Sequence, residues 1–582
     1  MTDADGEVRE ISAANVSTYK IGYVNITHPS YPFKVKGLQP DPLLPMTLAN
    51  GQRLGWQPSG GMDPTLRGVQ PNTTQLFYVL FRVPNDSAPG VYKGSLKVGC
   101  TDDAGNPAPD VTIQVSLTVS PFSVAQRTLK TAFALDSRRV MLSNSLTGKW
   151  LNKNDLYGHG LSQVTETTTY HADQLNTWIR YMADHRLSSQ VLSPAWTGPA
   201  ANGTMSARHD VLDDYLAAGQ ATTFDGDRLA LNAVKLPEYA PPAWIKNPFS
   251  SKAAQGQAAR YYRSADSALG PYRSKAYVYP VDEPRANMRA FVEKYAKFLL
   301  TTDPTTQKNK LVKGVDIYAQ RLQFFFRDAS WVNKIHKARK EVWIYSHGSA
   351  WQGQVPVYLI DRSLADSRVQ GWFAYRTGAT GLLYWNVNSW RAAVGTAPRD
   401  PYVDPVSGLS VVGKTHIYNN GDGSLLYPGY YPRLGLNVEG AGPVGSLRME
   451  ALRDGLEDYE YVRLVRARYG AGTANAYVNR IIAPLPRPKR QTAVPRLRGL
   501  TRRVRGRARR HGGSSVPLAD ADGREATYGR VGPARSAKIS SPASVLPAEY
   551  SAMEAKGVAR SAGRGSTNLS SSPVMGCVSL SW

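Results

Sequence analysis

Short strand-like segments alternate with amphipathic helical segments from about residue 128 to about residue 470, and this alternation limits the possible folds more than any other feature. The strand-like segments are TAFAL, KAYVYP, GVDIYA, EVWIYS and GLLYWN, all rich in β-branched and aromatic residues. Apolar residues at helical spacing predict helices at 175–182, 288–299 and 452–462. Repeated βα units in one block predict a TIM-type (β/α) barrel over residues 126–475, with an open doubly wound sheet as the alternative.

The first 125 residues have a different pattern, in which strands follow one another without helices. Residues 111–119 alternate strictly between apolar and polar side chains, as a strand does when it buries one face. Before them, QLFYVLFRV and VYKGSLKV flank the turn-forming segment PNDSAPG. This pattern predicts a β-sandwich over residues 1–125. Because little chain precedes the first strand-like segment, we expect this domain to be truncated at its N-terminus.

The last part of the chain, residues 476–582, loses the apolar periodicity. Between Arg487 and Arg510 it carries eleven basic and no acidic residues, a large share of the formal net charge of +25. A segment rich in Pro, Arg, Gly and Ser buries too little apolar surface to offset its chain entropy, so we expect a disordered basic tail. A run of this kind can bind nucleic acid or another polyanion.

Composition argues against several classes of protein. Hydrophobic residues make up 42% of the chain, but no apolar run approaches the roughly 20 residues of a membrane-spanning helix. Cys100 and Cys577 are too few for a disulfide framework or a four-ligand zinc site, and the nine histidines form no H-E-x-x-H motif. We therefore expect no membrane span, no metal and no other cofactor. The acidic start MTDADGEVRE lacks an apolar region, so we expect no signal peptide in this chain.

The segment VYPVDEPR carries two adjacent carboxylates, Asp282 and Glu283, directly after a predicted strand. In a (β/α) barrel the carboxyl ends of the strands form the active-site face. Neighbouring carboxylates repel each other, which can keep one of them protonated near neutral pH, and a glycosidic oxygen needs such a general acid. The alternative is structural, because acidic residues before Pro284 also complement the dipole of a following helix.

A second candidate segment, GLLYWNVNSW, places Trp385 beside the amide of Asn388. Aromatic rings stack on the C–H faces of sugars while amides bind their hydroxyl groups. The alternative is a buried strand whose aromatic side chains belong to the core. The later segment YNNGDGSLLYPG carries Asp422 in a Gly-rich loop, which is also consistent with a simple turn.

Four motifs, in this order, resemble glycoside hydrolase family 123: VYPVDEP, DRSLADSRVQGWFAYRTGATGLLYWNVNSW, GDGSLLYPG and SLRMEALRDGLEDYEYV. The segment VLFRVPNDSAPGVYKGSLKV is similar to the β-sandwich that precedes that family's catalytic domain. The resemblance covers about residues 10–470. It implies a (β/α)8 barrel, β-N-acetylgalactosaminidase-type activity and retention of configuration by substrate assistance. The catalytic aspartate and glutamate of the family match Asp282 and Glu283.

The resemblance also implies a role for each carboxylate. The 2-acetamido carbonyl of the sugar would attack its own anomeric carbon, so that no protein nucleophile is needed. Glu283 would protonate the leaving oxygen and later deprotonate water, while Asp282 would orient the acetamido N–H and stabilise the oxazolinium. From strand-end positions we predict substrate-binding residues, with Tyr345 and Trp385 as the wall of the pocket and two hydrogen-bonding residues, Tyr318 and Asn388.

Other functions stay open at this point. One is a non-catalytic glycan-binding protein on the same scaffold, and another is a polyanion-binding protein that acts through the basic run at 487–510. If a protein nucleophile replaces the acetamido group, Asp316 and Asp361 are candidates. The expected partner is a glycan or glycoconjugate, and this substrate class favours an extracellular or cell-envelope location.

Overall fold

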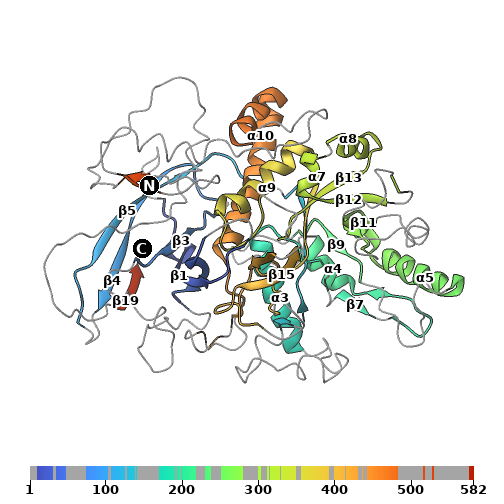
Figure 1. Ribbon diagram of the computed structural model, residues 1–582, viewed down its shortest axis with the longest axis horizontal. Coiled ribbons are helices and arrows are strands. Elements are labelled where there is room, and N and C mark those ends of the chain that lie inside the picture. Colours follow the sequence, from blue (N-terminus) through green and yellow to red (C-terminus); the bar gives the residue numbers. More distant parts are fainter. Residues whose placement is uncertain are drawn as a thin grey trace.

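The computed structural model has antiparallel sheets at one end of the molecule and a mixed α/β body at the other (Figure 1). It describes residues 9–30, 35–47, 74–84, 86–101, 106–124, 127–137, 139–140, 169–190, 192, 195–197, 199–217, 230–237, 251–279, 299–302, 311–312, 315–327, 329–348, 355–391, 393, 399–412, 415–429, 431, 436, 442–482, 515–517, 527–529 and 576–581. The predicted pair Asp282 and Glu283 lies outside these residues, as does the basic run at 487–510.

Two antiparallel sheets of three strands each consist of β1 (Val16–Ile26), β2 (Gly37–Pro45), β3 (Phe77–Phe81), β4 (Gly90–Thr101), β5 (Val111–Val119) and β19 (Gly576–Ser581). In the first sheet β1 lies between β2 and β3. In the second β4 lies between β5 and β19, so a late segment of the chain pairs with an N-terminal strand. The strand predicted at 111–119 is thereby confirmed as β5.

A parallel sheet forms the centre of the α/β body. Its strands are β6 (Lys130–Phe133), β11 (Leu299–Thr302), β12 (Val315–Arg321), β13 (Glu341–Tyr345) and β14 (Gly381–Tyr384). They lie in the order β11-β12-β13-β14-β6, and all neighbours are parallel. Four of the predicted strands are confirmed here as β6, β12, β13 and β14. The helix predicted at 288–299 lies outside the described residues except for Leu299, which begins β11.

Backbone hydrogen bonds continue this order beyond β6. The N–H of Phe133 donates to Ser188 O at 3.0 Å, and the N–H of Lys235 donates to Gln190 O at 2.6 Å. Lys235 belongs to β9 (Val234–Lys235), which is parallel to β10 (Ala276–Tyr277). The full order is therefore β10, β9, 188–190, β6, β14, β13, β12, β11, as in an eight-stranded α/β barrel. Within the described residues no pairing joins β10 to β11, so the parallel α/β sheet is confirmed and its closure is not.

The helices of the α/β body are α3 (Thr169–Asp184), α4 (His209–Leu216), α5 (Lys252–Ala268), α7 (Leu322–Arg327), α8 (Ala329–Lys337), α9 (Leu364–Thr377) and α10 (Leu447–Ile481). The helices predicted at 175–182 and 452–462 are confirmed as parts of α3 and α10. None of the helices described here is both long and apolar enough to cross a membrane.

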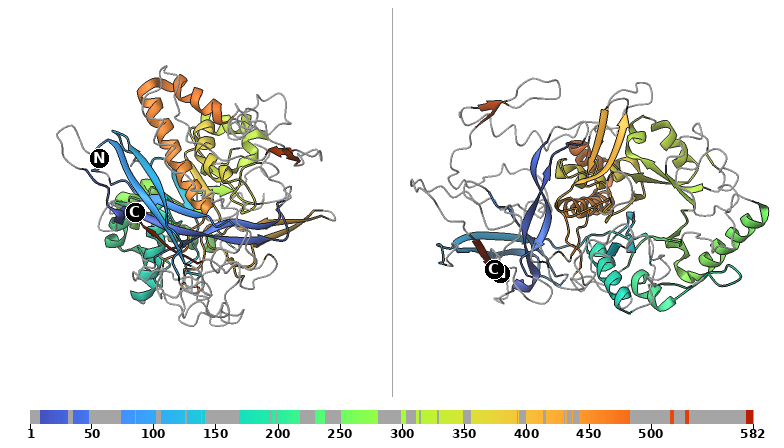
Figure 2. Two further views of the ribbon diagram at one scale, coloured as in Figure 1. Left: turned by 90° about the vertical axis from the view of Figure 1, so that its left-hand side faces the viewer. Right: turned by 60° about the horizontal axis from the view of Figure 1, so that its bottom comes forward.

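The remaining elements are short: η1 (Ala13–Asn15), β7 (Trp196–Thr197), β8 (Ser206–Ala207), η4 (Gly270–Lys275), β15 (Val406–Val412), β16 (Thr415–Asn420), β17 (Ser515–Pro517) and β18 (Thr527–Gly529). The hairpin β15–β16 lies beside the ends of β1 and β2 (Figure 2). Ser30, which follows β1, forms a β-bridge with Tyr418. The α/β body and the N-terminal strands thus share backbone contacts.

Two glycines allow α9 and α10 to approach each other closely. A Cβ atom on Gly371 would lie 1.9 Å from Gly455 O, and one on Gly455 would lie 2.0 Å from Arg368 O. Polar contacts add to this interface, because Asp458 on α10 accepts hydrogen bonds from Arg368 Nε at 2.7 Å and Trp372 Nε1 at 2.8 Å.

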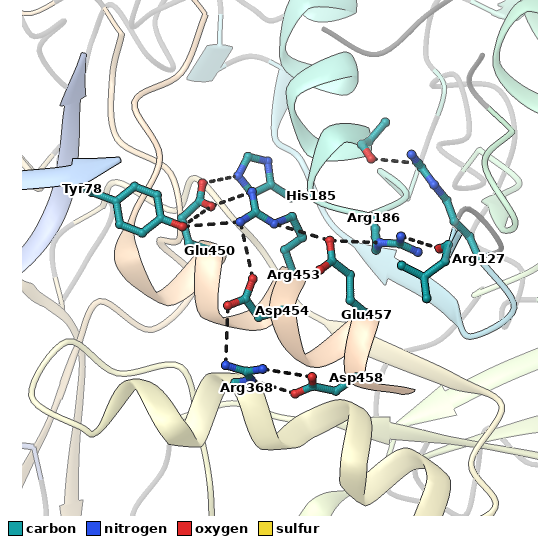
Figure 3. Close-up of polar contacts among 12 residues, drawn as sticks. Tyr78, Arg127, His185, Arg186, Arg368, Glu450, Arg453, Asp454, Glu457 and Asp458 are labelled. Atoms are coloured by element: carbon teal, nitrogen blue, oxygen red, sulfur yellow. Dashed lines mark hydrogen bonds and ion pairs between the residues drawn. The ribbon is translucent and has the colours of Figure 1, made fainter. Parts of the chain in front are cut away.

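Buried charges on α10 fasten the N-terminal sheet to the α/β body. The guanidinium of Arg448 makes two hydrogen bonds with Asp41 of β2, at 2.9 and 2.8 Å, and both side chains are buried. Two residues further along α10, Glu450 bonds His185 Nε2 at 2.7 Å, Arg453 Nη1 at 2.7 Å and the hydroxyl of Tyr78 at 3.1 Å (Figure 3). Burial alone raises the pKa of Glu450, but Arg453 and His185 hold that pKa well below its ordinary value.

Candidate active site

The two faces of the parallel sheet have different neighbours. The outer face packs against the helices, as when Tyr318 contacts Trp331 of α8 edge to face with ring centroids 5.9 Å apart. The inner face forms a separate cluster of strand residues, which consists of Ala132, Ala233, Tyr277, Ile317, Ala319, Trp343 and Leu383. Successive residues of a strand point to opposite faces, so the position of a residue within its strand decides which face it joins.

The sheet is strongly curved, so that side chains of distant strands meet on its inner face. The rings of Tyr277 on β10 and Trp343 on β13 lie 5.4 Å apart at an angle of 71°. In the sheet order, β9, residues 188–190, β6 and β14 all lie between these two strands. Their side chains can meet only if the sheet curls round, as it does in a barrel.

Several polar and aromatic side chains lie where the inner face meets the carboxyl ends of the strands, which we call the carboxyl edge. Lys235, Tyr279, Arg321 and Tyr345 each follow a member of the inner cluster by two residues, and two of them, Tyr279 and Tyr345, pack directly against that cluster. Tyr345 is half-buried and is paired in register with Arg321 and with Leu383. In a fold of this kind the carboxyl edge is the reactive side.

Lys235 is a buried cation at the carboxyl edge that sequence reasoning missed. Its Nζ lies 3.4 Å from Gln190 Oε1 and 5.5 Å from the centroid of the Tyr279 ring. Tyr279 precedes Asp282 by only three residues in the chain. The dipeptide VK gave no signal in the sequence, because a two-residue strand has no recognisable periodicity.

Trp385 directly follows β14 at the same edge and is held by the loop after β16. Its Nε1 donates a hydrogen bond to Asp422 Oδ2 at 3.2 Å, and the guanidinium of Arg391 lies 6.0 Å from the ring centroid. Gly423 has a φ of 71°, and a Cβ atom there would lie 2.2 Å from the indole. The ring is partly exposed, so Trp385 and Tyr345 both present aromatic surface at the ends of neighbouring strands.

Asp422 was named from the sequence as part of a Gly-rich loop, but its contact with Trp385 was not predicted. It is buried and accepts a hydrogen bond from the Tyr384 hydroxyl at 3.1 Å in addition to the one from Trp385. Burial raises the pKa of Asp422 to about 6, and hydrogen bonds from Gly348, Tyr384 and Trp385 act in the opposite direction. The motif GDGSLLYPG contained the signal, since a Gly-Asp-Gly turn allows backbone to approach a ring closely.

The other two predicted substrate-binding residues have different surroundings. Tyr318 lies on the outer face, fully buried, and its hydroxyl accepts a hydrogen bond from the N–H of Val312 at 2.9 Å. Asn388 is also fully buried, and its amide bonds the backbone N–H and C=O of Asp136 at 2.9 and 3.0 Å. The structure therefore brings Tyr345 and Trp385 to one edge and places Tyr318 against the helices, while Asn388 holds the loop after β6.

Neither candidate protein nucleophile is well placed for that role: Asp316 lies away from the carboxyl edge, and Asp361 already accepts hydrogen bonds from protein groups. Asp316 is the second residue of β12, near its amino end, and pairs with Lys340. Asp361 is buried, and its Oδ2 accepts hydrogen bonds from Ser30 N at 2.5 Å and Asn420 Nδ2 at 2.9 Å. Among the residues that the structure describes, no group of three or more His, Cys, Asp or Glu side chains could hold a metal ion.

Comparison with known families gives this arrangement a context. The family model of the glycoside hydrolase 123 catalytic domain matches residues 275–465. That stretch runs from β10 into α10 and contains Asp282, Glu283, Tyr345 and Trp385, so the resemblance expected from the motifs is confirmed. The match supports glycoside hydrolase activity on glycan substrates. No curated protein matches the chain.

A solved structure supports the same fold. It is that of a family 123 glycoside hydrolase from Clostridium perfringens, which was studied for glycolipid glycan hydrolysis. The similarity covers 82% of this chain and 80% of that one, with a TM-score of 0.51 and 13% sequence identity.

Proposed function

We propose that this protein is a glycoside hydrolase that removes a β-linked 2-acetamido sugar, of the N-acetylgalactosamine type, from glycoconjugates. The observation that carries the proposal is the family 123 match at 275–465, because this stretch includes both Asp282 and Glu283. The carboxyl edge supports it. Tyr345 and Trp385 lie there, and Tyr279 at the same edge precedes Glu283 by only four residues, which limits their separation to roughly 14 Å.

We also propose that the sheet closes into a (β/α)8 barrel over residues 126–475. The sheet order from β10 to β11 supports closure, as does the contact of Tyr277 with Trp343 across the interior. Residues 1–125 would form the β-sandwich, for which the two antiparallel sheets give support, with β19 as an added strand. The tail predicted over residues 476–582 would then begin after Ile481, where α10 ends, and would not include β19.

In the proposed mechanism the sugar supplies its own nucleophile. The acetamido oxygen forms a bond to the anomeric carbon while the bond to the leaving oxygen breaks, and Glu283 gives that oxygen a proton. Asp282 accepts a hydrogen bond from the acetamido N–H, which orients this group, and stabilises the positive charge of the oxazolinium. Water then attacks the anomeric carbon and gives its proton to Glu283, which restores the acetamido group with net retention.

Tyr345 and Trp385 would form the aromatic wall against which the sugar lies. Their rings come from adjacent strands, and both are partly exposed at the carboxyl edge. Lys235 lies on β9, which pairs with β10, and adds a positive charge at the same edge.

The proposal is tested by hydrolysis of a β-N-acetylgalactosaminyl disaccharide, whose poor leaving group makes protonation necessary. Glu283→Gln should lower kcat by about 100- to 10,000-fold, and Asp282→Asn by about 100- to 1,000-fold. Asp316→Asn is the matched control, because that carboxylate lies at the amino end of β12, and it should leave kcat unchanged. Unchanged turnover in Glu283→Gln would rule out the proposed acid. Binding of the disaccharide by wild type without hydrolysis would favour a non-catalytic glycan-binding protein.

A second experiment tests substrate assistance and the substrate class. A thiazoline analogue of the oxazolinium should inhibit competitively, whereas indifference to it would favour a protein nucleophile. Glycolipid glycans belong in the substrate panel, because the similar clostridial enzyme was studied for their hydrolysis.

A further inference from the structure

We propose that Asp422 is a positioning residue for the sugar site, because its carboxylate fixes the plane of the Trp385 indole. This inference rests on the proposed function. Asp422 Oδ2 accepts the hydrogen bond from Trp385 Nε1 at 3.2 Å, and Oδ1 accepts the one from the Tyr384 hydroxyl at 3.1 Å. One buried carboxylate thus holds two successive residues at the end of β14.

The backbone of the same loop holds the indole from a second direction. Gly423 lies so close to the ring that a Cβ atom would be 2.2 Å from it, and the φ of 71° is one that only glycine adopts freely. The N–H of Gly423 also donates to the Tyr384 hydroxyl at 2.5 Å. The loop therefore fixes both the hydrogen-bonding edge of Trp385 and the space available to the ring.

Both oxygens of Asp422 accept hydrogen bonds from protein groups, which argues for positioning rather than for catalysis. A partly exposed tryptophan at a strand end has several rotamers, and only one of them presents a given face to a ligand. Ordering the ring before the sugar binds removes that entropic cost from binding. The loss of Asp422 should therefore weaken binding of the ground state and the transition state alike, which raises KM and leaves kcat nearly constant.

The α9–α10 interface provides a matched control. Asp458 also accepts a hydrogen bond from a tryptophan, Trp372 Nε1 at 2.8 Å, but it does so between two helices. Asp458→Ala should therefore lower stability without any change in KM.

The test is a double-mutant cycle of Asp422→Ala and Trp385→Phe, where phenylalanine keeps an aromatic ring but lacks the N–H. Each single variant should raise KM for the disaccharide by about 10-fold with kcat within about 3-fold, and the double variant should show much less than the product of the two effects. Asp422→Asn retains one acceptor oxygen and should lie between wild type and Asp422→Ala. If the KM of the double variant rises by the product of the two single effects, the two side chains act independently and the inference is wrong.

A spectroscopic readout separates this inference from the proposed function. In protein labelled with 5-fluorotryptophan, the 19F resonance absent from Trp385→Phe identifies Trp385. That resonance should shift and broaden in Asp422→Ala and stay unchanged in Asp458→Ala. A shift in a protein without glycosidase activity would refute the proposed function and leave the positioning intact. An unchanged resonance in an active enzyme would refute the positioning alone.

Discussion

Tyr318 and Tyr345 lie on neighbouring strands of the parallel sheet, yet one belongs to the core and the other to the candidate site. Tyr318 pairs in register with Val342 and packs on Trp331 of α8, with its hydroxyl bonded to Val312. Tyr345 pairs with Arg321 and borders the inner cluster. Closeness to the carboxyl end of a strand is thus not enough to place a residue in the site, because the side chain must also point to the inner face.

The comparison is tested most strongly by truncating both tyrosines. Tyr318→Ala should lower the free energy of unfolding by about 3–5 kcal/mol, because it leaves a cavity at a fully buried position. Tyr345→Ala should lower kcat/KM by about 10- to 100-fold with a smaller loss of stability, since its ring is half-buried. Urea unfolding and steady-state kinetics on both variants check this. A folded Tyr318→Ala protein with impaired kcat/KM would break the assignment of the two faces.

The buried carboxylate of Asp422 should make the stability of the protein depend on pH. Its pKa of about 6 in the folded state exceeds the value of about 3.9 for an exposed aspartate, so the folded protein holds the proton more tightly than the unfolded chain. Wild type should therefore lose stability relative to Asp422→Asn as the pH rises from about 4 to about 6, by up to about 3 kcal/mol.

The groups that face Asp422 are the hydroxyl of Tyr384, the indole of Trp385, the N–H of Gly348 and the guanidinium of Arg448. Unfolding curves of both proteins between pH 4 and pH 8 measure the difference. If the difference in free energy of unfolding between the two proteins stayed constant across this range, burial would not raise the pKa of Asp422.

Asn388 should behave as a structural residue despite its place in the candidate motif. Asn388→Ala removes two hydrogen bonds to the backbone of Asp136 and should lower the free energy of unfolding by about 2 kcal/mol. KM of the folded protein should stay within about 2-fold of wild type. A large rise in KM without loss of stability would mean that Asn388 contacts the sugar.

The smallest expected effect separates the hydroxyl of Tyr318 from its ring. Tyr318→Phe keeps the packing on Trp331 but leaves the N–H of Val312 without this partner, so it should cost about 1 kcal/mol of stability. Kinetic constants should be unchanged. A change in kcat without a change in stability would indicate that the Tyr318 hydroxyl contacts the substrate.

The sequence predicted the elements better than their faces. Strands β12, β13 and β14 were evident from runs of β-branched and aromatic residues, and α3 from its apolar stripe. The same runs do not show which residues face the inner side of the sheet and which the outer side. A strand that is buried on both faces has no alternation of apolar and polar residues. In β12, Ile317, Tyr318 and Ala319 are all buried, so nothing in the pattern separates Tyr318 from its neighbours.

The parts of the site that the sequence did not reveal depend on contacts between distant segments. The sequence pointed to Asp422 but not to its hydrogen bond with Trp385, because the two residues are 37 positions apart. Lys235 lies at the carboxyl edge because β9 pairs with β10. A short sequence motif does not show contacts between residues that are far apart in the chain. The adjacent carboxylates Asp282 and Glu283 could be chosen from the sequence because both the pair and its position after a strand are local features.

The most direct test of the proposed chemistry is kcat/KM for aryl β-galactosaminides that carry acetyl, fluoroacetyl, difluoroacetyl or trifluoroacetyl groups on the 2-amino nitrogen. Fluorine withdraws electrons from the carbonyl oxygen, so an acetamido nucleophile becomes weaker with each substitution. We expect hydrolysis of the acetyl substrate and a steep, progressive fall in kcat/KM across the series. No hydrolysis of the acetyl substrate, or rates that are independent of the number of fluorine atoms, would contradict it.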